Sequence, residues 1–579
     1  MKNIKTIALI ITLNVIATMQ LIAQNNTFGW AKRTGAQFDD SGNSIVTDAA
    51  GNIYTTGYFE GSVDFDPGSG TFNLNFNGLG DVFIQKLDAA GNFGWAKQMG
   101  GTGFDRGYSI AIDGAGNIIT TGSFENTVDF DPSAVGSFNL TATDSLDIFI
   151  QKLDPNGNFL WAKRMGGTGD EEGKSVAIDV NDNIIVTGYF SSVTDFDPGT
   201  PVFNLTSNGL FDNFIIKLDA SGNFKWVTQT GNSNYDNSKA VTADLSGNIY
   251  STGAFNGTVD FDPGLNSYPL TSNGGSLYGD IFIQKLDTGG NFIWAKQMGW
   301  FGDDIGTSIK TDAAGNVYAT GWFQNTVDFN PGTGALDTFN LITTGTAAGN
   351  PYSDDIFILK LDAGGNFIWA KNMGGDNDDR GNSLAIDNTG KILATGYHSG
   401  LGDFNPGTGT SNLTGDGTFL EKLDNAGNFI WAKEVGTAGE GGHCITSDAN
   451  GNLYTTGHFD HTVDFNPDPG PPFNLVSNAG SIDFYVLKLN SASAGIDENI
   501  LDNTGNIFPN PNKGQFNIDL GKTYSDLNIE IKNIADEVVY ASTISETNHL
   551  SLNIKQPAGF YFVTVSNDAS QRTFKLILN

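Results

Sequence analysis

Short runs of alternating hydrophobic and polar residues, separated by turn residues, recur along most of the chain. Residues 280–287 (DIFIQKLD) and 292–296 (FIWAK) flank a Thr-Gly-Gly-Asn turn, and residues 308–312 and 317–323 flank an Ala-Ala-Gly-Asn turn. Runs of this length bounded by Gly and Asn are typical of β-strands joined by tight turns. The sequence shows no apolar stripe with the 3.6-residue period of a helix. The pattern therefore predicts an all-β protein.

The same four-strand unit is written seven times. Its Trp recurs every 62 to 75 residues, at Trp30, Trp95, Trp161, Trp226, Trp294, Trp369 and Trp431. Four strands per repeat is the content of one propeller blade. The first unit lacks a Lys-Leu-Asp strand before Trp30, and the last ends at residues 484–490 without a Trp strand after it. We therefore predict a seven-bladed β-propeller with Velcro closure, in which residues 28–60 and 482–490 share a blade and hide two sheet edges.

The repeated unit, DxFIxKLDxxGNFxWAK followed by SIAIDxxGNIYTTG, resembles the SBBP beta-propeller repeat family of exported bacterial proteins over about residues 28–490. Residues 87–97 (LDAAGNFGWAK) also resemble, more weakly, the tryptophan-docking repeat of quinoprotein propellers. That likeness implies that the Trp wedges between neighbouring blades. The repeat pattern itself supports this interpretation, because one large side chain at the same place in every unit indicates packing between blades.

The first 24 residues have the pattern of an export signal. Lys2 and Lys5 precede an apolar run over residues 7–16, and Ala23 offers a cleavage site. The alternative is a membrane anchor, but polar residues interrupt a run that is short for the ~20 apolar residues of a span. We expect export, signal removal and no transmembrane segment in the remaining chain.

The tail after about residue 495 differs in period and composition. Residues 491–503 are polar and turn-rich, and residues 507–520, 527–540 and 557–579 read as alternating strands, enough for a small β-sandwich. These segments resemble the type A sorting domain of type IX secretion. The residues that carry the likeness are Asn510, Pro511, Gly514, Phe516, Pro557, Gly559, Tyr561 and Lys575. The resemblance implies handling by the type IX machinery and a secreted or outer-membrane surface location in a Gram-negative bacterium. An ordinary accessory sandwich is the alternative.

Four segments follow from these patterns. We expect a signal peptide at 1–24, the propeller at 25–490, a linker at 491–503 and the sorting domain at 504–579. The 579 residues carry 30 Lys and Arg against 64 Asp and Glu, a net charge of −34, with a single cysteine, Cys444. This balance argues against a nucleic-acid partner, which needs clustered positive charge. One cysteine excludes an internal disulfide and a cysteine zinc site.

Most carboxylates occupy fixed places in the repeat. Asp at the start of a turn accepts hydrogen bonds from backbone N–H groups two residues on, so turn stabilisation is the first interpretation. Calcium is the alternative, since it binds carboxylate and carbonyl oxygens on turns. The metal candidates are the acidic pairs of the first four DFDP-type segments: Asp64, Asp66, Asp129, Asp131, Asp195, Asp197, Asp260 and Asp262. In later units the second Asp becomes Asn, which fits either interpretation.

A single catalytic or metal site on a ring of repeats requires residues that differ from the repeat pattern in one unit. His443, Cys444, His458 and His461 gather in the last unit, but His458 and His461 are three apart and point to opposite faces of a straight strand. Cys444 replaces a strand Ser and favours packing over nucleophilic chemistry. No catalytic residue is assigned, and no cofactor other than calcium is indicated.

We expect a non-enzymatic surface propeller that binds or adheres to an extracellular glycan or protein. An extracellular polysaccharide hydrolase or lyase and a passive structural protein are the alternatives. The ligand candidates are side chains outside the repeat pattern, for each of which core packing is the competing interpretation: Trp300, Phe301, Trp322, Tyr397, His458 and His461.

Overall fold

The computed structural model describes residues 26–133, 135–330, 338–345, 352–436, 441–478, 480–491, 506–533, 537–567 and 571–579. The predicted signal peptide (1–24) and nearly all of the predicted linker (491–503) lie outside them. The chain divides into two compact units, one spanning Gln24–Ser491 and one that includes Ala492–Asn579. Each unit is described by itself below.

The first unit is built from antiparallel sheets that share a core of four strands. In the described residues these cores are β2 (Ser41–Thr47), β3 (Ile53–Phe59), β6 (Asp81–Leu87), β7 (Phe93–Met99); β8 (Arg106–Ile112), β9 (Ile118–Phe124), β12 (Asp147–Leu153), β13 (Phe159–Gly167); β14 (Glu171–Ile178), β15 (Ile184–Phe190), β18 (Asp212–Leu218), β19 (Phe224–Thr230); β20 (Asn237–Ala243), β21 (Ile249–Phe255), β24 (Asp280–Leu286), β25 (Phe292–Met298); β26 (Ile305–Thr311), β27 (Val317–Phe323), β30 (Asp355–Leu361), β31 (Phe367–Gly375); β32 (Arg380–Ile386), β33 (Ile392–Ser399), β36 (Asp416–Leu423), β37 (Phe429–Val435); and β38 (Gly442–Ser447), β39 (Leu453–Phe459), β42 (Asp483–Asn490), β1 (Thr27–Thr34).

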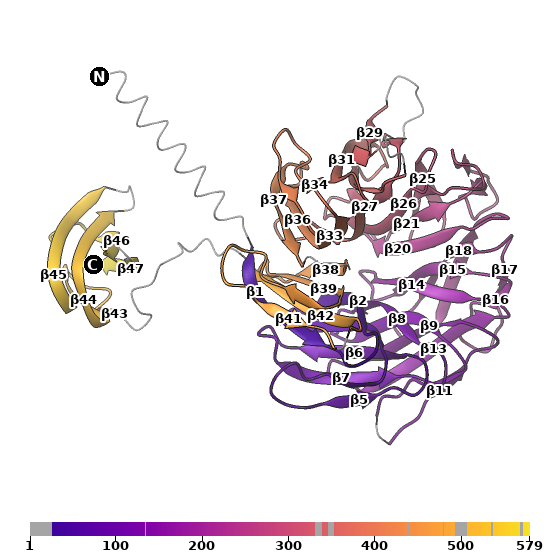
Figure 1. Ribbon diagram of the computed structural model, residues 1–579, viewed down its shortest axis with the longest axis horizontal. Helices are drawn as coiled ribbons and strands as arrows, with labels where there is room; N and C mark the ends of the chain where they lie inside the picture. The colour runs from indigo at the N-terminus through magenta and orange to yellow at the C-terminus, as the bar shows by residue number, and fades with distance from the viewer. Residues whose placement is uncertain are drawn as a thin grey trace. The chain divides into compact units, whose positions relative to one another are not determined.

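The sheets form a closed ring around the innermost strands (Figure 1). Each innermost strand contacts the next, in the order β2, β8, β14, β20, β26, β32, β38 and back to β2. The predicted all-β propeller is confirmed. Closure also follows the prediction, because β1 pairs with β42 from Thr27↔Asn490 to Thr34↔Phe484. The shared sheet ends at β1, however: residues 41–59 were expected in it and instead begin the neighbouring sheet as β2 and β3.

Two-strand hairpins lie between the second and third strands of each unit. They comprise β4 (Ser62–Asp64) and β5 (Asn73–Asn75), β10 (Thr127–Asp129) and β11 (Asn139–Thr141), β16 (Val193–Asp195) and β17 (Asn204–Thr206), β22 (Thr258–Asp260) and β23 (Pro269–Thr271), β28 (Thr326–Asp328) and β29 (Asn340–Ile342), β34 (Gly402–Asp403) and β35 (Asn412–Leu413), and β40 (Thr462–Asp464) and β41 (Asn474–Val476). They account for a period longer than the roughly 40–50 residues of common propeller repeats.

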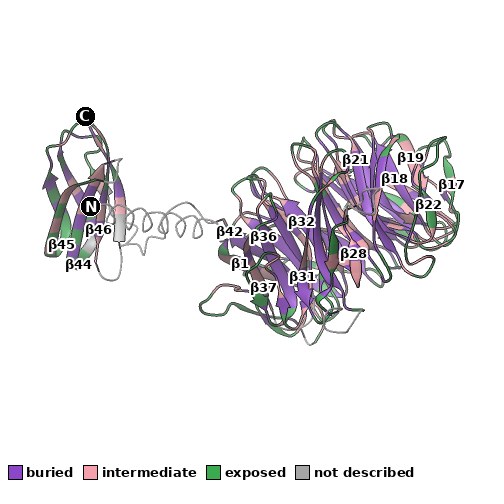
Figure 2. Cartoon of the chain, turned by 90° about the horizontal axis from the view of Figure 1, so that it is seen from above, coloured by how far each residue is buried: buried purple, intermediate pink, exposed green. Residues whose placement is uncertain are grey.

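Hydrophobic residues of adjacent sheets interlock to form the core. One cluster joins Tyr250 and Ile281 of one sheet to Phe323 and Phe357 of the next, all 0% exposed. Buried residues run along the strands and exposed residues collect in the loops (Figure 2). Because each sheet buries both faces against its neighbours, the strands are apolar along most of their length.

The repeated Trp joins each sheet to the next, as predicted. Trp30 Nε1 and Lys488 Nζ, from paired strands of one sheet, both donate to the carbonyl oxygen of Ala89 in the next sheet, at 3.4 and 2.8 Å. A Cβ added to Gly91 of that turn would lie 3.0 Å from the Trp30 ring. Trp226, Trp294 and Trp369 repeat this contact with the carbonyl oxygens of Thr288, Ala363 and Asn425.

The C-terminal unit, predicted to be a small β-sandwich, is a sheet domain in which the five described strands are joined by hydrogen bonds into one sheet. Its strands are β43 (Asn506–Phe508), β44 (Gln515–Asn533), β45 (Val538–Asn553), β46 (Gly559–Ser566) and β47 (Gln571–Leu578). The long strand β44 pairs with β45 along one edge and with β43 and β46 at different places on the other. One hydrophobic core, which includes Phe516, Ile529 and Leu576, serves the whole sheet.

Candidate binding site

The two faces of the propeller differ in their connections. At one, here called the turn face, short turns join the first strand of each sheet to the second and the third to the fourth. At the other, the loop face, lie the starts of the innermost strands, the ends of the second strands, and the loops and hairpins. Register shows this, since Ser41 at the start of β2 pairs with Tyr58 near the end of β3.

Turn-face aspartates stabilise turns, as the first interpretation predicted. Asp48 Oδ1 accepts from the N–H groups of Ala50 and Asn52, both at 2.9 Å, and Asn52 Nδ2 donates to Asp48 Oδ2 at 2.7 Å. Burial pushes the pKa of Asp48 upward, but these hydrogen bonds and one from Tyr54 outweigh it and hold the pKa below its usual value. The same arrangement recurs at Asp88, Asp113, Asp154, Asp219 and Asp448.

A second set of carboxyl groups is buried beneath the loop face. Asp105 is 0% exposed and accepts from the N–H groups of Gly101 (2.7 Å) and Glu125 (3.1 Å). Burial raises its pKa to about 7, and the nearby Asp81 adds to the shift. Asp40 is held in the same way, with its pKa raised by burial to about 8. These groups fix the loops by hydrogen bonds and do not reach the surface.

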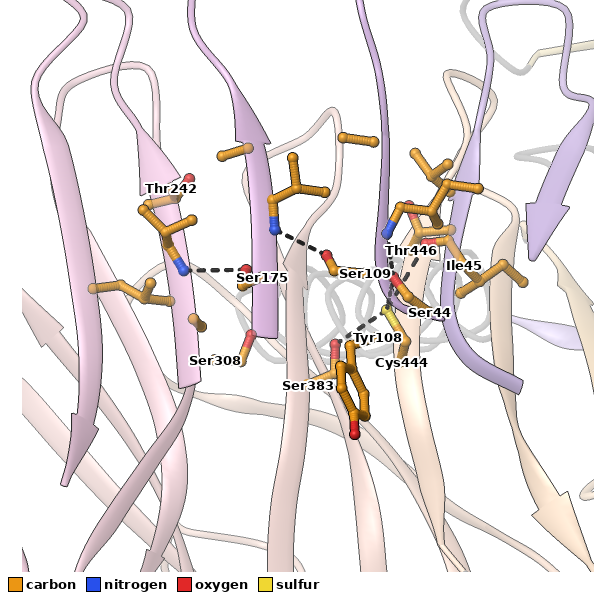
Figure 3. Close-up of a pocket in the computed structure, with 18 of the residues that line it drawn as sticks. Ser44, Ile45, Tyr108, Ser109, Ser175, Thr242, Ser308, Ser383, Cys444 and Thr446 are labelled. Carbon is orange, nitrogen blue, oxygen red and sulfur yellow. Dashed lines mark hydrogen bonds between the residues drawn. The ribbon is translucent and has the colours of Figure 1, made fainter. Parts of the chain in front are cut away.

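The centre of the ring is a channel of about 400 Å³ lined by the innermost strands. In the wall of the channel, a row of serine hydroxyls links neighbouring innermost strands (Figure 3). Val176 N–H donates to Ser109 Oγ at 3.1 Å, and Val241 N–H donates to Ser175 Oγ at 3.2 Å. Cys444 occupies this row as predicted, half-buried, with its Sγ 3.7 Å from Ser383 Oγ.

Each residue of this row is preceded in its strand by one that lies closer to the loop face, and the identity of that preceding residue differs from strand to strand. The seven positions are Asn43, Tyr108, Lys174, Lys239, Thr307, Asn382 and His443. Lys174 forms an ion pair with Glu172, and its Nζ lies 3.7 Å from the centre of the Tyr108 ring and 5.4 Å from that of Tyr189. Burial and the neighbouring Lys174 lower the pKa of Lys239 to about 8.

Aromatic and cationic side chains continue around this mouth of the channel. The Arg106 guanidinium lies 5.1 Å from the Tyr58 ring and 5.4 Å from the Phe104 ring, and that of Arg380 lies 5.2 Å from the Trp322 ring. We call the following set the collar: Tyr58, Phe104, Arg106, Tyr108, Lys174, Tyr189, Phe211, Tyr235, Lys239, Trp322 and Arg380. Cationic groups above aromatic rings hold both in place by cation–π attraction.

All six predicted ligand residues lie at the loop face. Trp322, Tyr397 and His458 occupy equivalent places near the ends of β27, β33 and β39. Trp300 and Phe301 lie in the loop between β25 and β26, 51% and 58% exposed, with ring centroids 6.1 Å apart. Their role in binding remains a prediction.

The histidines separate into two groups. His458 packs edge-on against His443 with ring centroids 4.6 Å apart, whereas His461 lies in the turn after β39, largely exposed, beside Asp460. Among the residues that the structure describes, no three His, Cys, Asp or Glu side chains converge as metal ligands.

The proposed calcium residues are occupied as turn acceptors. Asp64 Oδ1 accepts from the N–H groups of Asp66 (3.1 Å) and Phe72 (2.7 Å), and Asp66 Oδ1 accepts from Gly68 (2.8 Å). The units of Asp129, Asp195 and Asp260 repeat the pattern. Asn405 Oδ1 accepts the same bond from Gly407, so the loop does not require the second charge. The calcium site stays a prediction.

The sorting-motif residues tie the ends of the C-terminal sheet together. Asn510 Oδ1 accepts from Ile577 N–H, and its Nδ2 donates to the carbonyl of Lys575. Gly514 has φ +101°, and a Cβ there would lie 2.3 Å from the Ile554 carbonyl oxygen. Phe516 is buried, Tyr561 Oη donates to the carbonyl of Pro557, and the Lys575 ammonium lies over Phe560. Pro511 and Gly559 flank these contacts.

Sequence reasoning missed most of the collar. Tyr108, Lys174, Tyr189 and Lys239 lie within strands that mostly follow the repeat, so each resembles an ordinary strand residue in its own unit. Aligning the seven copies would have found the signal: the residue before the small Ser, Ala or Cys of the innermost strand varies widely, whereas that small residue and the aliphatic residue after it change little.

Each of the two units matches a known protein family. Residues 506–579 match the secretion system C-terminal sorting domain, and residues 29–58 and 225–257 match the beta-propeller repeat SBBP. The chain carries SBBP repeats and a type IX sorting domain. The sorting domain is handled by type IX secretion, so the protein is secreted or displayed at the outer-membrane surface of a Gram-negative bacterium.

Three individual proteins to which the chain is similar share little sequence with it. An uncharacterized WD repeat-containing protein of Acanthamoeba polyphaga mimivirus is 26% identical over 79% of this chain, which spans 38% of that protein's length. The WD40 propeller domain of Doa1 is 8% identical and covers 80% of this chain and 97% of the domain, with a TM-score of 0.36. PorZ of Porphyromonas gingivalis, described as a surface component of type IX secretion, is 9% identical and covers 96% and 100%, with a TM-score of 0.23. No helix in the described part of the chain is long and apolar enough to cross a membrane.

Proposed function

We propose that this exported propeller is a non-enzymatic module that binds an extracellular glycan at its loop face and thereby serves adhesion. The observation that carries the proposal is the collar, where aromatic and cationic side chains gather around one mouth of the channel. Aromatic rings offer flat apolar surface to sugar rings, and the neighbouring polar groups fix orientation. Exposed rings extend the surface outward: Tyr235 is 56% exposed and Trp300 51%.

Burial of the loop-face carboxyl groups favours binding over hydrolysis. A general acid at neutral pH needs a raised pKa, and burial raises the pKa values of Asp105 and Glu171 to about 7 and 8. Both side chains are 0% exposed and are engaged by the loops that cover them. A general acid must reach the glycosidic oxygen of its substrate, which these groups do not.

The test is retention of the full-length protein on a panel of immobilised polysaccharides. The double substitution Trp300→Ala with Phe301→Ala should weaken retention, because it removes two adjacent exposed rings. Phe562→Ala is the matched control, since Phe562 is 44% exposed but belongs to the C-terminal sheet.

Three results would contradict the proposal. Retention unchanged in the double variant would remove the assignment of these rings. Retention on no polysaccharide would favour the structural alternative. Release of new reducing ends from the panel would favour the hydrolase or lyase alternative.

A further inference from the structure

Two lysines from adjacent innermost strands lie side by side at the mouth of the channel. Lys174 on β14 and Lys239 on β20 occupy equivalent positions, and both line the channel. They stand together in a chain with a net charge of −34. Two like charges in a partly dehydrated channel repel each other, so this arrangement costs stability unless something compensates it.

Among the described residues, only one of the two lysines forms an ion pair with a carboxylate. Glu172 pairs with Lys174, and both side chains are largely buried, 13% and 18% exposed. Among the described residues, no carboxylate lies within ion-pairing distance of Lys239. The cluster of Glu172, Lys174 and Lys239 therefore keeps one net positive charge, facing the channel.

Behind these lysines, the second residue of β18 is a buried amide, Asn213, at a position that is apolar in most other units. Asn213 is 2% exposed, and neither its Oδ1 nor its Nδ2 has a hydrogen-bond partner among the described residues. Equivalent places hold the apolar Val82, Ile148, Ile281, Ile356 and Phe484, and in the sixth unit Thr418, whose hydroxyl bonds to Tyr485 Oη, whereas Asn213 has no such bond in the described part of the chain. Asn213 pairs across the strands with Tyr189, and Tyr189 pairs with Glu172, so the orphaned amide lies in the same cross-strand row as the charged cluster.

The inner strand that carries Lys239 departs from the repeat as well. Ser238 stands where other innermost strands have Gly, and its Oγ accepts a hydrogen bond from Thr187 Oγ1 at 2.8 Å. The orphaned group at this place is the Asn213 amide, and a buried polar group without a partner is costly unless a ligand or water satisfies it. The two residues that break the repeat, Asn213 on β18 and Ser238 on β20, therefore both lie near Lys239.

A row of aromatic rings leads from this place to the surface. Tyr189 contacts Phe211 with ring centroids 5.1 Å apart, and Phe211 contacts Tyr235 at 5.5 Å. Tyr235 is the exposed end of the row. Rings beside an unpaired cation suit a ligand that presents both an apolar ring face and a negative charge.

We propose that Lys174 and Lys239 bind the acidic group of an anionic saccharide whose sugar rings lie along Phe211 and Tyr235. This inference rests on the proposed glycan binding and specifies its chemistry. An anion between the two ammonium groups removes their repulsion, and a charge-assisted hydrogen bond to it is stronger than a neutral one. An acidic peptide would satisfy the charge but would leave the aromatic row without a ring to stack on.

The experiment compares Lys239→Met and Lys239→Arg with the unaltered full-length protein. Binding is measured against polygalacturonate, its methyl-esterified form, dextran sulfate, neutral dextran and poly-glutamate. We expect Lys239→Met to weaken polygalacturonate binding about tenfold or more, and Lys239→Arg to retain it because the charge remains. The sulfated arm distinguishes sulfate from carboxylate as the acidic group. Lys225→Met is the matched control, since Lys225 is exposed on β19, the outer strand of the neighbouring sheet that also carries Lys174.

Thermal unfolding provides a readout that a purely structural lysine would not share. Without ligand, Lys239→Met should leave the midpoint unchanged or raise it, because it removes repulsion from Lys174. A lowered midpoint together with unchanged binding would show that the lysine is structural and overturn the proposal.

Other outcomes separate this inference from the proposed function. Equal binding of acid and methyl-esterified polymers would overturn the anion site and leave glycan binding intact. Binding of poly-glutamate as tight as that of polygalacturonate would assign the site to acidic peptides instead. Binding of no polysaccharide at all would overturn both proposals.

Discussion

The two faces of the propeller use carboxyl groups in opposite ways. On the turn face, Asp48 and its equivalents are mostly buried too, but hydrogen bonds to the charged carboxylate hold their pKa values below the usual value. Beneath the loop face, Asp40 and its equivalents are fully buried, and burial raises their pKa values. Both sets repeat around the ring. Carboxyl groups that recur in every unit therefore serve the fold on both faces. The collar and the exposed loop-face rings vary from unit to unit, which recognition of one ligand requires.

The largest expected effect is a pH response in which the two faces oppose each other. The folded pKa values of Asp40, Asp105 and Asp236 are raised to about 8, 7 and 7, above the value of about 4 for an unfolded Asp. The stability they contribute is fully present below pH 4 and is lost as the pH rises through 7 to 8. A pKa that is higher by one in the folded state changes the free energy of unfolding by about 1.4 kcal/mol. Turn-face carboxylates act in reverse and lose their contribution as the pH falls below 4.

Urea unfolding at pH 5, 7 and 9 measures this response. The free energy of unfolding should be highest near pH 5 and fall towards pH 9. Asp105→Asn should flatten part of the slope, because the amide does not titrate. A free energy that rises between pH 5 and 9 would contradict the assignment of protonated carboxyl groups beneath the loop face.

The next effect tests the turn face, where Asp179→Ala should cost about 3 kcal/mol or more. The change removes turn hydrogen bonds from Asn181 and Asn183 and leaves the Lys217 ammonium, 1% exposed and 2.9 Å from Asp179 Oδ2, without its carboxylate. Asp219→Ala is the control, because this turn aspartate makes similar bonds but is only half-buried and forms no ion pair with a buried lysine among the described residues. Equal losses in the two variants, measured by urea unfolding, would contradict the role of the ion pair.

A smaller effect tests whether departures from the repeat in the core are costly. Glu421 is 1% exposed, burial raises its pKa well above the usual value, and its carboxyl oxygens have no partner among the described residues. Gln85 and Gln284 at equivalent positions donate to the carbonyls of Phe65 and Phe261. Glu421→Gln should therefore stabilise the protein by about 1 kcal/mol at pH 8. Glu421→Leu copies Leu359 and Leu487 and removes the acid without adding a hydrogen bond. The difference in stability between the Gln and Leu variants therefore measures the new hydrogen bond. A Gln variant less stable than the unaltered protein in urea unfolding would contradict the prediction.

The smallest expected effect belongs to the variable layer of the loop face. Trp300→Ala should change the free energy of unfolding by less than about 0.5 kcal/mol, because the ring is half-exposed and outside the cores. Thermal unfolding of this variant checks it, with Trp294→Ala as the contrast: Trp294 is 9% exposed and joins two sheets. Similar losses for both would mean that Trp300 is part of the scaffold.

The scaffold could be predicted from sequence because its signals are local and repeated seven times. The Trp contact, the Asx turns and the closing pair of strands each follow from a short motif and its phase. One exception shows the limit. In the sixth unit Gly417 stands at the strand position that Asp81 holds in the first sheet, and Glu434 of the adjacent strand accepts the Thr414 N–H instead. A carboxylate moved to a neighbouring strand is not visible as a motif.

The candidate site was only half predictable for the same reason. Trp300 and Phe301 stand out as unusual loop residues, but Lys174 and Lys239 are 65 residues apart and look ordinary in their own strands. A register shift in each innermost strand, such as that between Gly173 and Ser175, decides which side chains face the channel. That irregularity cannot be read from the alternation of hydrophobic and polar residues.

The sequence by itself determined the strands, the repeat, the turn chemistry and the sorting tail of this protein. Each depends on interactions between residues close in the chain or on a pattern copied in every unit. Only the tertiary structure decided which side chains meet at the channel mouth and which carboxyl groups are buried. Closing the ring brings one position from every unit to a common axis, and the resulting charge, burial and repulsion belong to the assembled ring rather than to any single unit.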